Sequence, residues 1–386
     1  MTLPLLALGL ALAAPPQSFP MNDAGITLNL APSYEMTRWS DWDFKAKTRD
    51  GVQVKVWTTP FQVEVTEDAV KAWAGMYATE MEGEGFADVV VESAKVTTVG
   101  GRATGRVKLS MQPRSGGPMK AVLHAMSFTG NAQVIHAYSI AIARLDDKAD
   151  RALVDLVSSL DLNKKPAETT SAVTTSAGFA ATLPAGWRAP LPEELSATIA
   201  VTSKAGEEKL DPESCLVGIL PPPTGEPDVI FACTAALYLG PVDEHSYAGV
   251  EPEVRSRFFG RVDPPVPAAE AAKVGDRTGF YFRPGGGEHP VRLVVAPYGA
   301  GKVMMMWGLA NRLDAAGLDA ALQQTLPTVS FSGENAGAPV IGLDKKIGYY
   351  LKYRTFSPVV MGPALVLLAL AGLVLRAITR KPTPAE

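Results

Sequence analysis

The sequence predicts an α+β protein with two tandem antiparallel-sheet sandwich domains and packed helices, followed by one C-terminal transmembrane helix. Three observations lead to this prediction. Two long segments, residues 22–163 and 177–332, share short motifs in the same order. Within both segments, strand-like alternation of apolar residues recurs and a helical pattern closes the segment. A charge-free apolar run, residues 359–375, lies near the end of the chain.

The shared motifs indicate that one domain is duplicated. Each motif alone is short enough to arise by coincidence, but their common order within segments of domain length favours a repeat. The pairs are Ala24-Gly25-Ile26 with Ala177-Gly178-Phe179, Val99-Gly100-Gly101-Arg102 with Val274-Gly275-Asp276-Arg277, and Arg144-Leu145-Asp146 with Arg312-Leu313-Asp314.

Residues 1–14 are predicted to be a signal peptide. The apolar run Leu3–Ala14 is shorter than the roughly 17–25 residues of a membrane span. Ala11-Leu12-Ala13 fits a signal-peptidase site, although no Lys or Arg precedes the run. The alternative is a short buried helix at the start of a cytoplasmic domain.

Residues 358–375 are predicted to form the transmembrane helix, with the basic tail 376–386 behind it. Tyr349, Tyr350, Tyr353 and Phe356 precede the run, where an aromatic belt would lie. We therefore expect a single-pass membrane protein with a periplasmic or extracellular body and a cytoplasmic C-terminus. A buried core helix is the alternative for the run. A tail-anchored protein with a cytoplasmic body is the alternative if the signal peptide is absent.

The first segment is predicted to begin with a strand, Ile26–Leu30, and to close with a helix that Asp146 caps. Thr66 is a candidate N-cap for an earlier helix whose apolar residues recur at helical spacing. Gly130-Asn131 indicates a hairpin turn. The other expected elements are strands at Val52–Val56, Ala103–Met111, Met119–Phe128 and Gln133–Ala143, and helices at Glu67–Glu82 and Asp146–Leu160.

A polar linker, residues 164–176, separates the segments, and a second spacer, residues 333–357, leads to the apolar run. The second segment is predicted to contain strands at Phe179–Leu183, Thr278–Arg283, Val291–Val295 and Val303–Leu309, with a closing helix at Asp314–Leu326.

Cys215 and Cys233 lie in an additional hairpin of the second segment, symmetric about Thr224. Facing residues of an antiparallel pair are within disulfide reach. We expect a disulfide if the body is exported, and two buried thiols if it is cytoplasmic. The proline-rich tip, residues 221–227, is either an interaction surface or a loop without a role.

The sequence contains no catalytic, cofactor or metal motif that we recognise. Tyr298–Lys302 lacks the residues of a phosphate-binding loop and is predicted to be a turn. His124 and His136 are expected on opposite faces of a hairpin, as solvated side chains, and His245 and His289 have no ligand spacing nearby. Glu80, Glu82 and Glu84 are expected to form a solvated acidic face.

Four tryptophans form the predicted candidate binding surface: Trp39, Trp42, Trp57 and Trp307. Packing of Trp39 and Trp42 in the core or a linker is the competing interpretation. A nucleic-acid partner is excluded by the charge balance, 36 Lys and Arg against 40 Asp and Glu.

The order of elements, the opening strand that leads into Leu183-Pro184-Ala185-Gly186-Trp187, and the Gly-x-Arg turn resemble the PsbP-like family. This family includes photosystem accessory proteins and the Ran-binding Mog proteins. The resemblance implies binding and assembly factors without a shared catalytic motif. We therefore predict a non-enzymatic, membrane-anchored interaction or assembly factor that binds another protein of the cell envelope. A binder of a small apolar or carbohydrate ligand and a hydrolase with a dispersed site are the alternatives.

Overall fold

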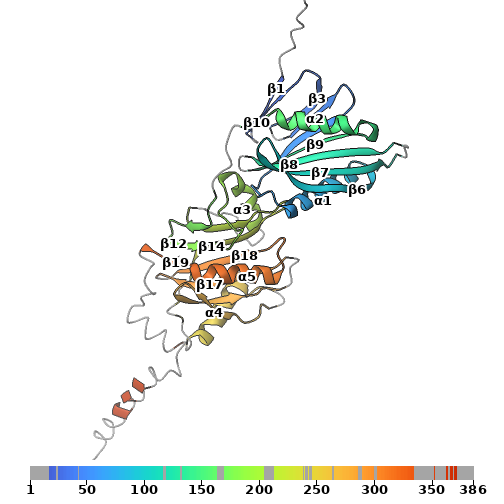
Figure 1. Cartoon of the computed structure of the whole chain (residues 1–386). Helices are drawn as coiled ribbons and strands as arrows, with labels where there is room; N and C mark the ends of the chain where they lie inside the picture. Colours follow the sequence, from blue (N-terminus) through green and yellow to red (C-terminus); the bar gives the residue numbers. More distant parts are fainter. Residues whose placement is uncertain are drawn as a thin grey trace, which may run out of the picture. The chain divides into compact units, whose positions relative to one another are not determined.

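The computed structural model (Figure 1) describes most of the region between residues 17 and 333. The described ranges are 17–22, 25–41, 43–115, 119–130, 133–162, 169–203, 213–237, 239, 242, 246–262, 265–285, 289–299 and 302–333, with 352, 362–363, 366–367 and 369–371 near the C-terminus. The predicted signal peptide, residues 1–14, and residues 164–168 of the predicted linker 164–176 lie outside the described residues.

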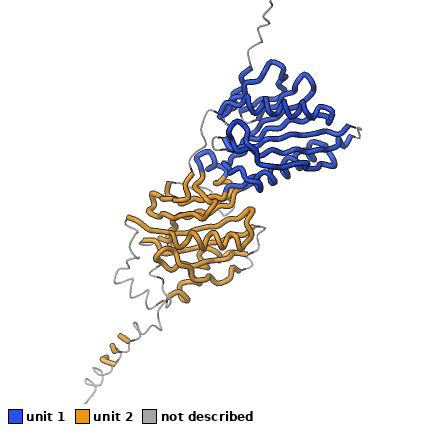
Figure 2. The backbone as a smooth tube through the Cα atoms, viewed as in Figure 1, with its two compact units in different colours: residues 1–168, 191–197, 221–226 blue, residues 169–190, 198–220, 227–386 orange. Residues whose placement is uncertain are grey.

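The chain forms two compact units (Figure 2). Unit 1 comprises residues 1–168 together with two short later segments, 191–197 and 221–226. Unit 2 comprises residues 169–190, 198–220 and 227–386. Each unit contains one large and one small antiparallel sheet.

Unit 1 is built on a seven-stranded sheet of order β3-β4-β5-β9-β8-β7-β6. The strands are β3 (Tyr34–Trp39), β4 (Asp43–Thr48), β5 (Gln53–Thr59), β6 (Phe86–Val99), β7 (Arg102–Pro113), β8 (Ala121–Gly130) and β9 (Gln133–Ile142). The small sheet has the order β1-β2-β10, with β1 (Gln17–Met21), β2 (Ile26–Leu30) and β10 (Leu160–Leu162).

Helices α1 (Glu67–Gly83) and α2 (Asp146–Ser158) lie on opposite faces of the large sheet of unit 1. Gly105 of β7 faces α1 so closely that a Cβ atom there would collide with Val70 and Trp73. On the other face, the Ser139 hydroxyl of β9 donates a 2.7 Å hydrogen bond to the Ala149 carbonyl of α2. Because strand side chains alternate between the two faces of a sheet, successive residues of one strand face different helices.

Unit 2 repeats this construction. Its large sheet has the order β13-β14-β18-β17-β16-β15, which matches β4-β5-β9-β8-β7-β6 of unit 1 strand for strand. The strands are β13 (Leu216–Leu220), β14 (Asp228–Ala236), β15 (Glu270–Val274), β16 (Arg277–Phe282), β17 (Val291–Tyr298) and β18 (Lys302–Leu309). The small sheet β11-β12-β19 comprises β11 (Ala172–Thr174), β12 (Phe179–Thr182) and β19 (Ser330–Phe331).

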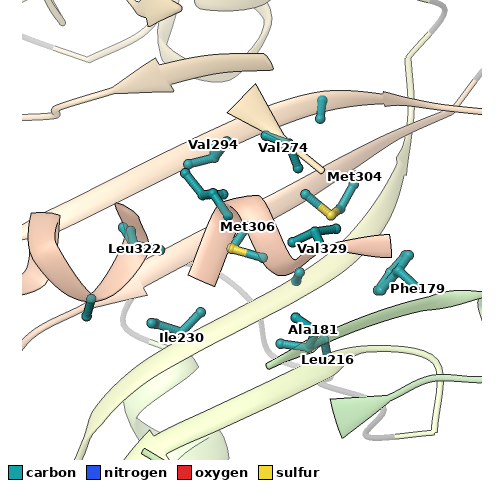
Figure 3. Close-up of a cluster of buried hydrophobic side chains, with 14 of the residues drawn as sticks. Phe179, Ala181, Leu216, Ile230, Val274, Val294, Met304, Met306, Leu322 and Val329 are labelled. Atoms are coloured by element: carbon teal, nitrogen blue, oxygen red, sulfur yellow. The ribbon is translucent and has the colours of Figure 1, made fainter. Parts of the chain in front are cut away.

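The remaining helices are α3 (Leu195–Ser203), α4 (Tyr247–Phe259) and α5 (Ala315–Thr325). One unit 2 core lies between α5 and the sheets: Met304, Met306, Val294 and Ile230 of the large sheet are buried with Leu322 of α5 (Figure 3). A second core packs Val250 and Val254 of α4 against the other face of the large sheet. The apolar faces of α4 and α5 are therefore covered by strands of the large sheet.

The predicted fold class requires two corrections. Among the described residues, no helix is both long and apolar enough to cross a membrane, so the predicted transmembrane helix over 358–375 and the single-pass membrane location are wrong. A span needs about 20 consecutive apolar residues in one helix, and most residues of the run 358–375 lie outside the described residues. In addition, strands rather than a balanced mixture of helices and strands dominate both units.

Several element predictions are confirmed with shifted bounds. Helix α1 begins after Thr66, whose hydroxyl accepts a 3.2 Å bond from the Ala69 amide, and α5 begins after Asp314, whose carboxylate accepts from the Gly317 amide at 2.7 Å. Asp146 does not cap α2, because it is the first residue of the helix and its carboxylate binds the sheet.

Candidate functional site

Three of the four predicted tryptophans are described, and each has its own surroundings. Trp39 is 47% exposed on β3, and its Nε1 atom donates to the Pro20 carbonyl at 2.9 Å. Trp57 lies half-buried on β5, stacked on His136 with ring centroids 5.1 Å apart. Trp307 packs against the α4 core of unit 2, and Trp42 lies outside the described residues. None of the four cavities whose walls are described contains any of these rings.

The largest described cavity is a groove of about 800 Å³ beside α2, which we call the α2 groove. One wall is the exposed side of α2, and the other consists of the β2–β3 loop and the β4–β5 turn. Buried Leu30, Val52 and Ala152 lie among its lining residues. The polar lining residues are Asn29, Ser33, Tyr34, Thr48, Arg49, Asp50, Lys148, Arg151, Asp155, Ser158 and Ser159.

Charges of both signs line the α2 groove. Lys148 of α2 and Asp50 of the β4–β5 turn form a 3.1 Å ion pair between exposed side chains. Among the described residues, the exposed guanidinium groups of Arg49 and Arg151 have no carboxylate partner. Burial, and then the nearby charge of Asp155, raises the pKa of Tyr34, whose hydroxyl donates to the Ala152 carbonyl at 3.3 Å. The groove therefore offers two cations and several hydroxyl groups to a polar ligand.

Sequence reasoning did not find the α2 groove. Its residues come from a loop, a turn and the exposed face of one helix, and each is an ordinary surface residue by itself. Their common feature is their position around one hollow, for which the linear sequence contains no spacing signal.

A second polar cluster contains His136 and is enclosed between α1 and the sheet. His136 Nδ1 is 2.9 Å from the Ser127 hydroxyl, and Nε2 is 3.2 Å from the Thr59 hydroxyl. The Tyr77 hydroxyl lies 2.7 Å from that of Ser127. Burial lowers the pKa of His136 to about 3, so the imidazole is neutral at pH 7. His136 is 0% and Ser127 1% exposed, which makes this serine and histidine inaccessible to a substrate.

His124 lies on the opposite face, in an ionic cluster that joins α2 to the sheet. Its Nε2 atom is 2.5 Å from Asp146, and its Nδ1 atom is 3.4 Å from Asp150. Lys108 binds Asp146 at 2.7 Å, and Arg106 pairs with Asp150. Burial alone would raise the pKa of Asp146, but hydrogen bonds from Lys108 and His124 lower it.

The two histidines thus lie on opposite faces, as predicted, but they are not solvated: His124 is 6% exposed. The β8–β9 register pairs His136 with Ser127 and Gly130 with Gln133. This register differs from that of a turn centred on Gly130-Asn131, but it leaves both histidines on the faces that were predicted. Among the described residues, no group of three or more His, Cys, Asp or Glu side chains could hold a metal ion.

An equivalent cluster joins α5 to the sheet of unit 2. Arg292 binds both carboxylate oxygens of Asp319, at 2.6 Å and 3.3 Å, and the Tyr281 hydroxyl donates to Asp319 at 2.5 Å. Burial by itself would raise the pKa of Asp319, and the bonds from Arg292 and Tyr281 lower it. Because β17 corresponds to β8 in the repeated sheet order, Arg292 and His124 lie on equivalent strands. These clusters attach α2 and α5 to their sheets.

Cys215 and Cys233 form a disulfide at the base of the β13–β14 hairpin, with Cα atoms 4.6 Å apart. The register Leu216↔Ala232 places the cysteines opposite each other, as the symmetry of the sequence predicts. The tip of this hairpin, residues 221–226, belongs to unit 1, where the Pro223 carbonyl accepts a 3.0 Å hydrogen bond from Trp73 Nε1.

Comparison with known proteins finds structures of similar fold, and it assigns no functional site to this chain. No family model and no curated relative matches the chain. Among solved structures, a PsbP from Synechocystis has a TM-score of 0.31 and 10% identity, covering 40% of this chain and 95% of that one. The Ran-binding protein Mog1p from Saccharomyces cerevisiae has a TM-score of 0.30 and 11% identity, covering 39% and 96%. A Bacteroides thetaiotaomicron protein has a TM-score of 0.28 and 12% identity, covering 51% and 63%.

The structural neighbours are thus a PsbP and a Mog1 protein, the two kinds of protein that the sequence resembles. At this identity the similarity concerns the fold alone. It assigns no functional residue to the chain, and the α2 groove is described from this structure only.

Proposed function

We propose that the chain is a non-enzymatic interaction factor, and that unit 1 binds a segment of another protein in the α2 groove. The observation that carries the proposal is the groove itself, a hollow of about 800 Å³ with buried apolar residues and exposed charged side chains in its walls. An apolar base with polar groups around it is the usual composition of a binding site.

The charges of the groove favour a protein segment over an apolar ligand or a sugar. Arg49 and Arg151 can each bind a carboxylate through two parallel hydrogen bonds, which gives both energy and orientation. The exposed Lys148–Asp50 pair contributes little to folding, so either group can exchange its partner for one on a bound segment. Among the described lining residues, Tyr34 is the one aromatic residue.

Site-specific photo-crosslinking tests this proposal. A photoreactive amino acid at Ser33 or Ser158 of the full chain should yield the same adduct in cells, because both residues line the groove. The matched control is Lys71, which is 67% exposed on α1, on the other face of the sheet. Arg151→Glu should remove the adducts at both groove positions. An equal adduct from Lys71, or no adduct from the groove, would refute the proposal.

A further inference from the structure

Strand β6 forms one margin of the seven-stranded sheet and pairs only with β7 among the strands that the structure describes. It is a long strand, Phe86–Val99, and three of the exposed large apolar side chains of unit 1 belong to it: Val90, Val91 and Val96. The outer backbone groups of an edge strand are a template for another strand. Figure 1 shows β6 at the border of the sheet.

The two halves of β6 differ in how regularly they pair with β7. The register with β7 shifts between Ala87 and Val90 and again between Val91 and Ser93, so the first half contains two bulges. Bulges are one of the devices that prevent a sheet edge from pairing with another chain. From Ser93 to Val99 the pairing with β7 is uninterrupted. This regular half contains no bulge, and Lys95 is the single charge that could hinder pairing of its edge.

The composition of the regular half suits strand pairing. It reads Ser-Ala-Lys-Val-Thr-Thr-Val, with one charge, Lys95, and four consecutive β-branched residues, Val96 to Val99. Val96 is 39% exposed, although valine is ordinarily buried in a sheet. Pairing of this segment with another strand would cover Val96 and satisfy the outer backbone groups.

We propose that the segment Ser93–Val99 pairs antiparallel with the same segment of a second copy of this chain. A two-fold axis perpendicular to the joined sheets must pass through a residue that faces its own copy. Val96 is the midpoint of the regular half, so an axis at Val96 pairs all of its residues.

Charge excludes the register that lies one residue earlier. With the axis at Val96, each Lys95 faces a Thr97, and the valines face each other. With the axis one residue earlier, the two Lys95 side chains would be directly opposite, and like charges in that position are destabilising. With the axis at Ala94, pairing would run into the bulge before Ser93. A second copy can therefore pair with this edge without like charges directly opposite each other, and the interface does not involve the α2 groove.

Sedimentation velocity of the full chain over a range of concentrations tests the dimer. The unmodified chain should sediment as a monomer–dimer mixture that shifts with concentration. Val96→Lys, which places two like charges at the axis, should raise the dissociation constant at least about fivefold. Val90→Lys is the matched control, since Val90 is on the same strand and 56% exposed but lies in the bulged half.

Single added cysteines test the register, because both native cysteines are in the disulfide. Val96→Cys should give a disulfide-linked dimer under mild oxidation, since this residue faces its own copy. Thr98→Cys should not, because Thr98 would face Ala94. The proposal is overturned if the unmodified chain stays monomeric at every concentration, if Val90→Lys weakens the dimer as much as Val96→Lys, or if Thr98→Cys crosslinks and Val96→Cys does not.

Discussion

His136 is the residue whose surroundings the sequence describes least well. As a member of a polar-looking strand it suggests a solvated side chain, yet it is completely buried among Trp57, Trp73 and Tyr77. Neutral imidazole has one donor and one acceptor nitrogen, and the hydroxyls of Ser127 and Thr59 satisfy both. The network joins α1 to the sheet, and burial lowers the pKa of His136 to about 3, so that its imidazole is neutral at pH 7.

We predict that burial of His136 makes the fold sensitive to mild acid. Its pKa is about 3 in the folded chain and 6.5 in the unfolded chain, so below pH 6.5 only the unfolded chain binds the proton. The stability contribution is complete above pH 6.5 and decreases by about 1.4 kcal/mol for each pH unit below it. Urea unfolding between pH 7 and pH 4 should show this slope. His136→Gln should lack it, whatever its absolute stability, and an equal slope in the variant would contradict the assignment.

Two glycines at equivalent places of the repeat should respond differently to substitution. Gly100 and Gly275 both have φ of +58°, a conformation that favours glycine. A Cβ at Gly100 would meet nothing within 4 Å, whereas a Cβ at Gly275 would collide with the Val329 carbonyl oxygen. Gly100→Ala should cost about 1 kcal/mol, and Gly275→Ala about 2–4 kcal/mol, in chemical denaturation. Equal losses of stability in the two variants would contradict this prediction. They would show that backbone strain alone, without the collision at Gly275, determines the loss.

At the scale of elements, a feature could be predicted where the residues that determine it lie close together in the sequence. The N-caps Thr66 and Asp314 act on amides three residues away, so they are visible in sequence. The cysteine pairing was visible because a hairpin is symmetric about its turn. Strands β3, β4 and β6 were missed: their side chains alternate weakly, and bulges interrupt β3 and β6. The apolar run at the C-terminus shows that composition alone does not establish a membrane span.

The disulfide should stabilise the β13–β14 hairpin, which is an integral part of the unit 2 sheet. It closes a loop with a sequence separation of 18 residues, for which chain entropy predicts about 3 kcal/mol. The double variant Cys215→Ala with Cys233→Ala should lose about that much stability in urea unfolding under oxidising conditions. Added reductant should destabilise the unmodified chain by a similar amount and leave the double variant unchanged. A reductant effect on the double variant would contradict this explanation.

At the scale of the whole molecule, the most regular feature is the repetition of one sheet order, β4-β5-β9-β8-β7-β6 and β13-β14-β18-β17-β16-β15. Three short motifs indicated a repeat in the sequence, although most side chains in equivalent positions differ. Helix-to-sheet attachment illustrates this: histidine, lysine and aspartate form the cluster in unit 1, and arginine, tyrosine and aspartate form it in unit 2. Chemical equivalence of this kind is invisible to a comparison of residue names.

The path of the chain has a practical consequence for anyone who wishes to dissect the protein. Unit 1 takes in residues 191–197 and 221–226 after the main chain has already entered unit 2. A fragment that ends at residue 168 would lack Glu194, which accepts a 3.0 Å bond from the Gln62 amide, and Pro223, the acceptor for Trp73. No single cut therefore releases both units intact. A minimal version of unit 1 must therefore include these two segments as grafted loops. Truncation at one end of the chain cannot produce it.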